Sequence, residues 1–161
     1  MIKVFFIADT HFNHKKIIEY ENRPFQDIEE MNNKMIENWN SVVGRMDKVF
    51  MLGDFGFYDT SRLLDKLKGF KILVMGNHDR RKSVKHWFES GFTEVSKYPI
   101  LYNNWLLSHE PVGTTIYKNI YGHLHSKGWN NEYRFCVSAE KINYTPINIE
   151  EIEKYFKEFE L

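Results

Sequence analysis

Five short clusters of metal-capable side chains are spread along the 161-residue chain, each at the end of an apolar run or beside a turn. They combine imidazole, carboxylate and amide groups, and they hold five of the seven histidines. A mixed nitrogen and oxygen donor set suits manganese, iron or zinc, and donor type alone does not separate these metals. In chain order the clusters are Asp9-x-His11, Gly53-Asp54, Gly76-Asn77-His78-Asp79, Ser108-His109 and Gly122-His123-Leu124-His125.

The number of candidate ligands favours two metals over one. Seven side chains are too many for one tetrahedral site, whereas a bridging Asp54 would give each of two metals four protein ligands. Two cations about 3.5–4 Å apart are a common design for phosphate-ester hydrolysis. A single Asp or His at a strand end is usually a cap or turn residue, so the prediction depends on all five clusters together. The candidates are Asp9, His11, Asp54, Asn77, His109, His123 and His125.

Three short apolar runs in the first half are typical of buried strands, because they are rich in β-branched and aromatic residues. They cover residues 4–8, 49–52 and 72–75, and each leads directly into one of the clusters. Helical patterns separate them, so the order strand–helix–strand–helix–strand predicts an α/β fold. Ligands of such folds collect at the carboxyl ends of the strands, where these clusters fall.

The helical patterns of this half have defined starts and stops. Asp27 with Glu30 three residues later is a capping signature, and it precedes a predicted helix over 28–42. A shorter helix is predicted over 60–67, with Gly69 as its stop. The apolar stripe expected on the longer helix consists of Ile28, Met31, Met35, Trp39 and Val42.

After Gly91 the sequence changes character, because short extended segments follow one another without long helical patterns between them. Turns separate some of these segments. The segments cover 94–99, 105–108, 116–121 and 134–137, and the expected turns are Asn103-Asn104 and Asn130-Asn131.

The chain returns to helix near its end, where Asn148 and Glu151 supply the cap. The sequence contains no repeat, low-complexity tract or linker, so we expect a single domain over residues 1–161. The apolar stripe expected on this last helix consists of Ile152, Tyr155, Phe156 and Phe159.

Composition limits the class of protein. Lys plus Arg and Asp plus Glu each number 22, so the formal charge is zero, which argues against a strongly basic nucleic-acid-binding protein. Hydrophobic residues make up 42%, enough for a core at this length. The lone Cys136 excludes an internal disulfide and a multi-cysteine zinc cluster. The first residues lack a signal-peptide pattern, and no run approaches the roughly 20 apolar residues that span a bilayer, so we expect a cytoplasmic protein without a membrane partner.

The ordered set D-x-H, G-D, G-N-H-D, S-H and G-H-x-H resembles the calcineurin-like metallophosphoesterases. The match runs from Val4 to His125, and the stretch ADTHFNHKKIIEYENRPF looks like a compact bacterial and phage-type branch of that superfamily. The resemblance implies a four-layer α/β/β/α sandwich, in which two packed sheets are flanked by helices.

The resemblance also implies a role for each matching residue. Two divalent cations, manganese first and iron, zinc, nickel or cobalt as alternatives, would lower the pKa of a bridging water and supply hydroxide for attack on phosphorus. His78 would donate a proton or hydrogen bond to the leaving-group oxygen, and Asp79 would orient His78. The implied ligands are Asp9, His11 and His125 for the first cation, Asn77, His109 and His123 for the second, and Asp54 as the bridge.

Residues next to the first cluster are candidates for contact with the substrate. Asn13 and His14 extend that cluster, and they are expected either to support a metal ligand or to contact the substrate phosphate, although polar residues at a helix start show the same pattern. Arg23 precedes Pro24, and its planar donors suit a phosphate clamp; the alternative is a surface arginine before a turn.

Two further motifs follow the clusters. The aromatic residues Phe55, Phe57 and Tyr58 come directly after the bridging Asp, and they either form a wall that stacks a base or pack in the core. The basic run 80–82 either attracts anionic substrates or forms a solvated helix start.

These residues together predict a metal-dependent phosphoesterase for phosphodiesters or phosphomonoesters, with a nucleotide-like or small phosphorylated substrate, such as a nucleotide or short RNA. Gly53-Asp54 continues as Phe-Gly-Phe rather than the Asp-Arg-Gly of protein Ser/Thr phosphatases, which argues against that activity. One alternative is a scaffold of the same fold that binds a protein partner, although none of the seven ligands has been lost. Another is a nuclease, for which zero net charge disfavours long duplexes but not a short single strand.

Overall fold

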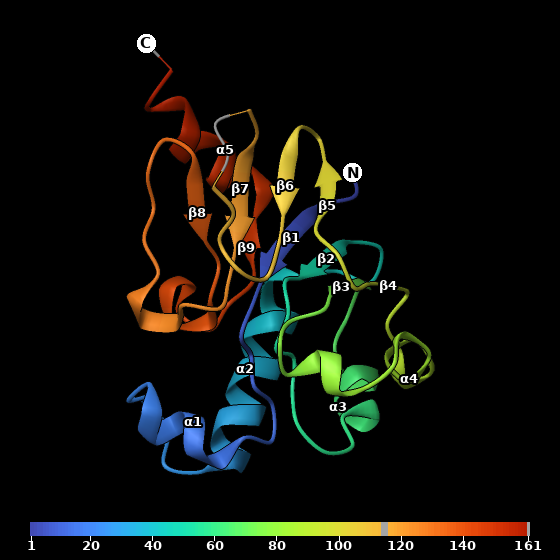
Figure 1. Ribbon diagram of the computed structural model, residues 1–161. Helices are drawn as coiled ribbons and strands as arrows, with labels where there is room; N and C mark the ends of the chain where they lie inside the picture. The colour runs from blue at the N-terminus through green and yellow to red at the C-terminus, as the bar shows by residue number, and fades with distance from the viewer. Residues whose placement is uncertain (114–115, 161) are drawn as a thin grey trace.

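The computed structural model describes residues 1–113 and 116–160, which form two β-sheets and five α-helices (Figure 1). The first sheet has five strands in the order β4-β3-β2-β1-β9, all parallel except β9 at one edge. Its strands are β1 (Val4–Ile7), β2 (Lys48–Met51), β3 (Phe70–Val74), β4 (Glu94–Ser96) and β9 (Ile147–Asn148).

The second sheet has four strands in the order β5-β6-β7-β8, with β5 antiparallel to β6 and the others parallel. The predicted turn at Asn103-Asn104 joins β5 to β6, and both asparagines are left-handed, with φ of 46° and 64°. Two left-handed residues are what a tight two-residue hairpin requires. The strands are β5 (Ile100–Tyr102), β6 (Trp105–Leu107), β7 (Lys118–Tyr121) and β8 (Arg134–Cys136).

Four helices pack on the first sheet, and they occupy the lower half of Figure 1, below the second sheet. They are α1 (Lys15–Tyr20), α2 (Ile28–Val42), α3 (Ser61–Lys66) and α4 (Val84–Ser90), and the fifth helix is α5 (Ile149–Lys157). Short 3-10 turns cover Asp79–Arg81, His125–Lys127 and Ala139–Ile142. Within the described residues no helix has the length and apolar character that crossing a membrane requires.

The strands of the first sheet bury both faces, which explains why they read as continuous apolar runs. In β1, Phe5 and Ile7 pack with the core residues of α1 to α4, whereas Val4 and Phe6 point to the other side. The second core also contains Leu107, Ile120 and Phe135 of the second sheet, together with Ile152 and Phe156 of α5. Two sheets flanked by helices confirm the predicted sandwich class.

The local signals of the two longest helices are confirmed. Asp27 caps α2 by accepting a hydrogen bond from the Glu30 N–H, and Asn148 with Glu151 forms a complete capping box on α5. The ends of the apolar stripes are wrong: Val42 is 38% exposed at the last residue of α2, and Phe159 lies beyond α5 and is 47% exposed. The apolar spacing in the sequence therefore continues beyond the last residue that packs against the core.

The ends of some strands differ from prediction, because pairing with neighbouring strands of a sheet decides where they begin and end. The segment predicted at 94–99 contributes only Glu94–Ser96, which joins the first sheet as β4 rather than the run of strands that follows. The segment predicted at 116–121 forms β7 from Lys118. The short helices α1 and α4 and the strands β5 and β9 were not predicted.

Candidate metal centre

The five clusters meet beyond the carboxyl ends of β1, β2 and β3, next to the ends of β6 and β7. Most of the predicted ligands have left-handed backbone conformations, which non-glycine residues rarely adopt and which concentrate at functional sites. The φ values lie between 48° and 70° in Asp9, His11, Asp54, His123 and His125.

Two glycines allow these loops to approach one another. A Cβ on Gly53, whose φ is +90°, would collide with the imidazole of His109, and a Cβ on Gly76 would collide with the carboxylate of Asp54. Both positions therefore require glycine, because the loop backbones and the functional side chains occupy that volume.

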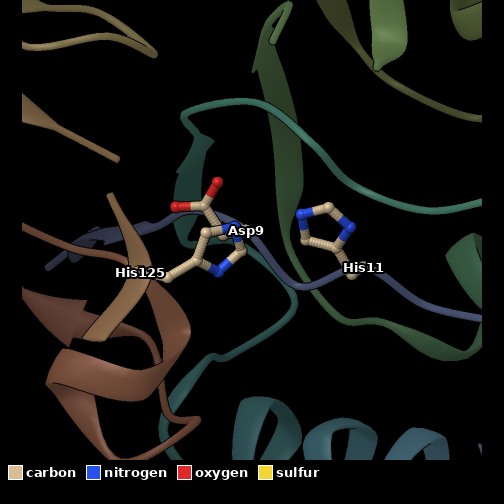
Figure 2. A group of neighbouring side chains, drawn as sticks. All are labelled: Asp9, His11 and His125. Carbon is tan, nitrogen blue, oxygen red and sulfur yellow. The ribbon is translucent and has the colours of Figure 1, made fainter. Parts of the chain in front are cut away.

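One group of donors consists of Asp9, His11 and His125 (Figure 2). Each offers one ligand atom, and these atoms lie within 4.8 Å of one another. Asp9 and His11 are 0% and 2% exposed, and Asp9 Oδ1 and His11 Nε2 have no hydrogen-bond partner within residues 1–113 and 116–160. Buried polar atoms without a partner are costly, and a bound cation would satisfy both.

A second group consists of Asn77, His109 and His123. Asn77 Oδ1 lies 3.0 Å from His109 Nε2 and 3.1 Å from His123 Nδ1, and the two imidazole nitrogens are 3.1 Å apart. Ligands on neighbouring corners of an octahedral cation are separated by about 3 Å. The three donor atoms therefore have the spacing of one face of a coordination shell.

Asp54 lies between these two groups. Its Oδ2 is 3.6 Å from His11 Nε2 and 3.5 Å from His109 Nε2, so one oxygen faces a histidine of each group. Its Oδ1 accepts a hydrogen bond of 2.9 Å from the His78 N–H, which fixes the orientation of the carboxylate.

Neighbouring groups orient the donors. His109 Nδ1 lies 2.8 Å from the Leu52 carbonyl, so an N–H there donates to that oxygen and leaves Nε2 free to bind a cation. Asp9 Oδ2 accepts hydrogen bonds from the Ser138 hydroxyl and from the His123 N–H, at 2.6 and 2.8 Å. Only Asp9 Oδ1 then faces the centre.

Burial and neighbouring charges shift the pKa values of several groups in the site. Burial raises the pKa of Asp9 to about 6, and burial lowers the pKa of His11 well below its usual value. Burial opposes ionisation of Asp54, but His109 outweighs it and holds the pKa of that carboxyl below its usual range. Burial also opposes protonation of His109, yet Asp54 and Asp9 raise its pKa to about 9. The carboxylates create a site for positive charge.

The structure places His78 beside the donors but corrects the predicted role of Asp79. The His78 side chain is 30% exposed, and its Nε2 is 3.9 Å from Asp54 Oδ2. Asp79 does not orient that ring: its oxygens accept hydrogen bonds from the backbone N–H groups of Asp54, Phe55 and Gly76. This buried carboxylate joins the loops that follow β2 and β3.

Arg23 is also corrected. Its side chain is 0% exposed, and its donors bond to the carbonyls of Asp9 and Thr10 and, at 2.6 and 2.9 Å, to Glu140 Oε1. A phosphate clamp needs donors that face the substrate, and here they hold the loop after β1 instead.

Glu140 was missed in the sequence. Its Oε1 lies 3.2 Å from His125 Nδ1, so it positions that imidazole as well as Arg23. The signal was present, because Glu140 follows the predicted strand at 134–137 in the same strand-then-polar pattern as the recognised clusters.

The other predicted substrate contacts have structural partners. The Asn13 side chain bonds to Asn32 and to the Phe57 carbonyl, which corrects its predicted role by fixing the loop to α2. His14 Nδ1 is 3.2 Å from His11 Nδ1, and its ring stacks on Phe57 at 4.2 Å.

The three aromatic residues after Asp54 lie in different surroundings. Phe55 is fully buried in the core, Phe57 is half-buried against the rings of His11 and His78, and Tyr58 is 82% exposed. A shared wall of three rings is therefore wrong, and only Phe57 and Tyr58 reach the surface of the site.

Comparison with known proteins agrees with this geometry. The family model of the calcineurin-like phosphoesterases matches residues 2–160. The chain belongs to this family. Members are hydrolases that use divalent metal ions on phosphate esters, so the chain is a metal-dependent phosphoesterase, and its donor groups are candidates to hold those ions.

Relatives share most of the chain. An uncharacterized protein of Methanocaldococcus jannaschii, MJ1445, is 34% identical over 96% of this chain and 91% of its own length. The structure of AQ665, a protein of unknown function from Aquifex aeolicus, has a TM-score of 0.75 at 27% identity, over 96% of this chain and all of the other. An archaeal phosphodiesterase has a TM-score of 0.51 at 18% identity, over 85% of this chain and 82% of its own, and therefore supports the fold alone.

Proposed function

We propose that the chain is a phosphodiesterase with two divalent cations, bridged by Asp54. The observation that carries this proposal is the position of one Asp54 oxygen, 3.5–3.6 Å from a histidine of each donor group. The first cation is assigned to the group around Asp9 and the second to the group around Asn77. The ligands are Asp9, His11 and His125 for the first cation and Asn77, His109 and His123 for the second, and both cations share Asp54.

Divalent cations at such a centre activate water as a nucleophile and neutralise charge on the phosphoryl oxygens. Manganese is our first choice of metal, because oxygen and imidazole ligands both suit it. A cytoplasmic location stays a prediction.

His78 is assigned the proton transfer. As the oxygen of water bonds to phosphorus, the bond to the leaving oxygen breaks. The water gives up a proton to solvent, and His78 gives the leaving oxygen a proton that the imidazole then regains from solvent. One feature supports the assignment: the ring is 30% exposed beside Asp54, so it can reach a substrate bound there. The Phe57 ring packs against His78 with centroids 5.2 Å apart and a tilt of 53°, which restrains the imidazole.

The exposure of the metal centre to solvent favours phosphodiesters over phosphomonoesters as substrates. Asn77 and His78 reach solvent at the edge of the centre, so both substituents of a phosphodiester have room to extend from it. A nucleotide-like substrate is the class proposed, since the phosphodiester of an oligonucleotide joins two large nucleoside substituents.

The test combines metal content with activity. Purified protein is loaded with Mn²⁺, Fe²⁺, Zn²⁺, Ni²⁺ or Co²⁺, its metal content is measured by mass spectrometry, and hydrolysis of p-nitrophenyl phosphate is compared with that of its bis-ester. We expect two Mn²⁺ per chain and a higher kcat/KM for the bis-ester.

A matched control uses Lys34→Ala, which removes an exposed ion pair with Glu37 far from the ligands and leaves activity unchanged. A stoichiometry of one metal would overturn the dinuclear proposal. Absence of hydrolysis with every metal would favour the scaffold alternative.

A further inference from the structure

A pocket beside His78 contains none of the proposed metal ligands. It combines aromatic and basic side chains, which is the combination that single-stranded nucleic acids bind. The side chains that matter here are Phe57, Tyr58, His78, Arg81, Lys82 and Trp87.

Tyr58 presents its ring to solvent at this pocket. The residue is 82% exposed and has a left-handed backbone, with φ of 60°. A bulky residue rarely adopts this conformation. The loop therefore holds an aromatic surface outside the core, next to the residue that is proposed to protonate the leaving group.

Arg81 and Lys82 add unpaired positive charge. Both side chains are exposed, and neither forms an ion pair or side-chain hydrogen bond with any residue in 1–113 or 116–160. The neighbouring Arg80 differs, because Glu110 binds it at 3.2 Å and neutralises it. Zero net charge over the whole chain thus conceals a local cationic pair.

We infer that this pocket is the leaving-group subsite for a single-stranded oligonucleotide. The base of the leaving nucleotide stacks on Tyr58, and its next phosphate binds Arg81 and Lys82. The orientation follows from His78, which lines the pocket and is assigned to the leaving oxygen. The inference rests on the proposed function only for the position of the scissile phosphate.

A single strand fits better than a duplex. Stacking needs an exposed base face, which a paired and stacked duplex does not offer. The basic side chains of Arg81 and Lys82 beside the Tyr58 ring provide contacts for one base and one phosphate, which is one nucleotide step. A long duplex instead requires an extended basic surface.

The kinetic test removes the base and the ring in turn. A dinucleotide is compared with an analogue whose leaving nucleoside lacks its base, in ribo and deoxyribo forms to distinguish RNA from DNA, using Mn²⁺-loaded protein. We expect the abasic analogue to lose about ten-fold in kcat/KM with the natural chain and little with Tyr58→Ala. Equal losses in both proteins would overturn the stacking assignment.

Control variants separate this pocket from general surface effects. Tyr98→Ala removes a ring of similar exposure, 73%, outside this pocket, and should leave all rates unchanged. The double variant Arg81→Ala/Lys82→Ala should weaken binding of a fluorescent hexanucleotide several-fold, whereas Arg45→Ala/Lys48→Ala, with exposed cations elsewhere, should not.

The two proposals fail in different ways. If the bis-ester is hydrolysed but the base makes no difference, the subsite is wrong while the phosphodiesterase proposal stands. If no ester is hydrolysed, the phosphodiesterase proposal fails, and fluorescence anisotropy with the hexanucleotide decides the subsite alone. Binding that Tyr58→Ala weakens would support it, and binding unchanged in both pocket variants would overturn it.

Discussion

Two buried aspartates flank strand β2, and their carboxylates have opposite surroundings. Asp47 precedes β2, and its two oxygens accept hydrogen bonds from the N–H groups of Lys3 and Gly44, at 2.8 and 2.7 Å. Asp54 follows β2, and its Oδ2 faces the imidazoles of His11, His109 and His78 at 3.5–3.9 Å. At the amino end of β2 both oxygens of the carboxylate are hydrogen-bonded to backbone N–H groups. At the carboxyl end a carboxylate oxygen and the neighbouring imidazoles are available to bind a metal ion.

The difference shows how stability and function are distributed in one sheet. At the amino end, each buried carboxylate oxygen contributes to folding through local hydrogen bonds. At the carboxyl end, left-handed residues and unpaired buried atoms are tolerated, because the surrounding sheet holds the loops in place. Substitutions at the carboxyl end should therefore reduce activity, and those at the amino end stability.

The largest effect is expected for Asp54→Asn. Loss of this carboxylate charge removes a ligand shared by both proposed cations, so metal content should fall toward zero and activity should become undetectable. Metal analysis and bis-ester hydrolysis measure the two effects. Asp47→Asn is the matched control. A fully active Asp54→Asn protein would show that the carboxylate at the carboxyl end of β2 is not required for function.

His78→Ala should reduce kcat while leaving metal content unchanged. Loss of a proton donor costs about 10²–10⁴-fold, and the loss should be greater for an alkoxide leaving group than for p-nitrophenolate, which needs no proton. Turnover of both substrates and metal analysis test this expectation. Equal losses on the two substrates would exclude the proton-donor role.

Glu140→Gln and Glu140→Ala test a residue at the carboxyl end that serves both purposes. Loss of the contact with His125 should weaken metal binding about 10–100-fold. Glu140→Ala should also destabilise the fold by about 3–5 kcal/mol, because it leaves the buried guanidinium of Arg23 without its anion.

Metal titrations and urea unfolding measure these two effects separately. Removal of the exposed Glu37 carboxylate, which pairs with Lys34, is the control and should cost less than about 1 kcal/mol. If Glu140→Ala matched that control, the buried pair would have no structural role.

The smallest effect is expected for Asp47→Asn, which should cost about 1 kcal/mol and leave kcat unchanged, because one N–H loses its acceptor. Burial opposes ionisation of Asp47, but the N–H groups of Lys3 and Gly44 outweigh it and hold its pKa below the usual range.

The sign of its pH dependence follows from this lowered pKa. The stability that Asp47 contributes is present above its unfolded pKa of about 3.9 and is lost as the pH falls through the lower folded value. Urea unfolding at pH 7 and pH 3 should therefore show a smaller difference between the Asn variant and the natural chain at pH 3. A constant difference would contradict the assignment.

Local pattern was sufficient wherever the relevant contacts lie close along the chain. The strands that end in the clusters and the caps Asp27 and Asn148 were predictable from neighbouring residues. The limits of the patterns were not, because Val42 and Phe159 continue the apolar spacing without a surface to cover.

The sequence by itself determined which chemical groups the protein has and in what order they follow the strands, since strand and helix periods are properties of short segments. Tertiary structure decided how those groups are used. Arg23 binds Glu140, 117 positions away, and Asp79 binds the loop after β2 rather than His78. The choice of partner depends on which segments the two sheets bring together, and a buried charge takes the nearest donor or acceptor rather than the one nearest in sequence.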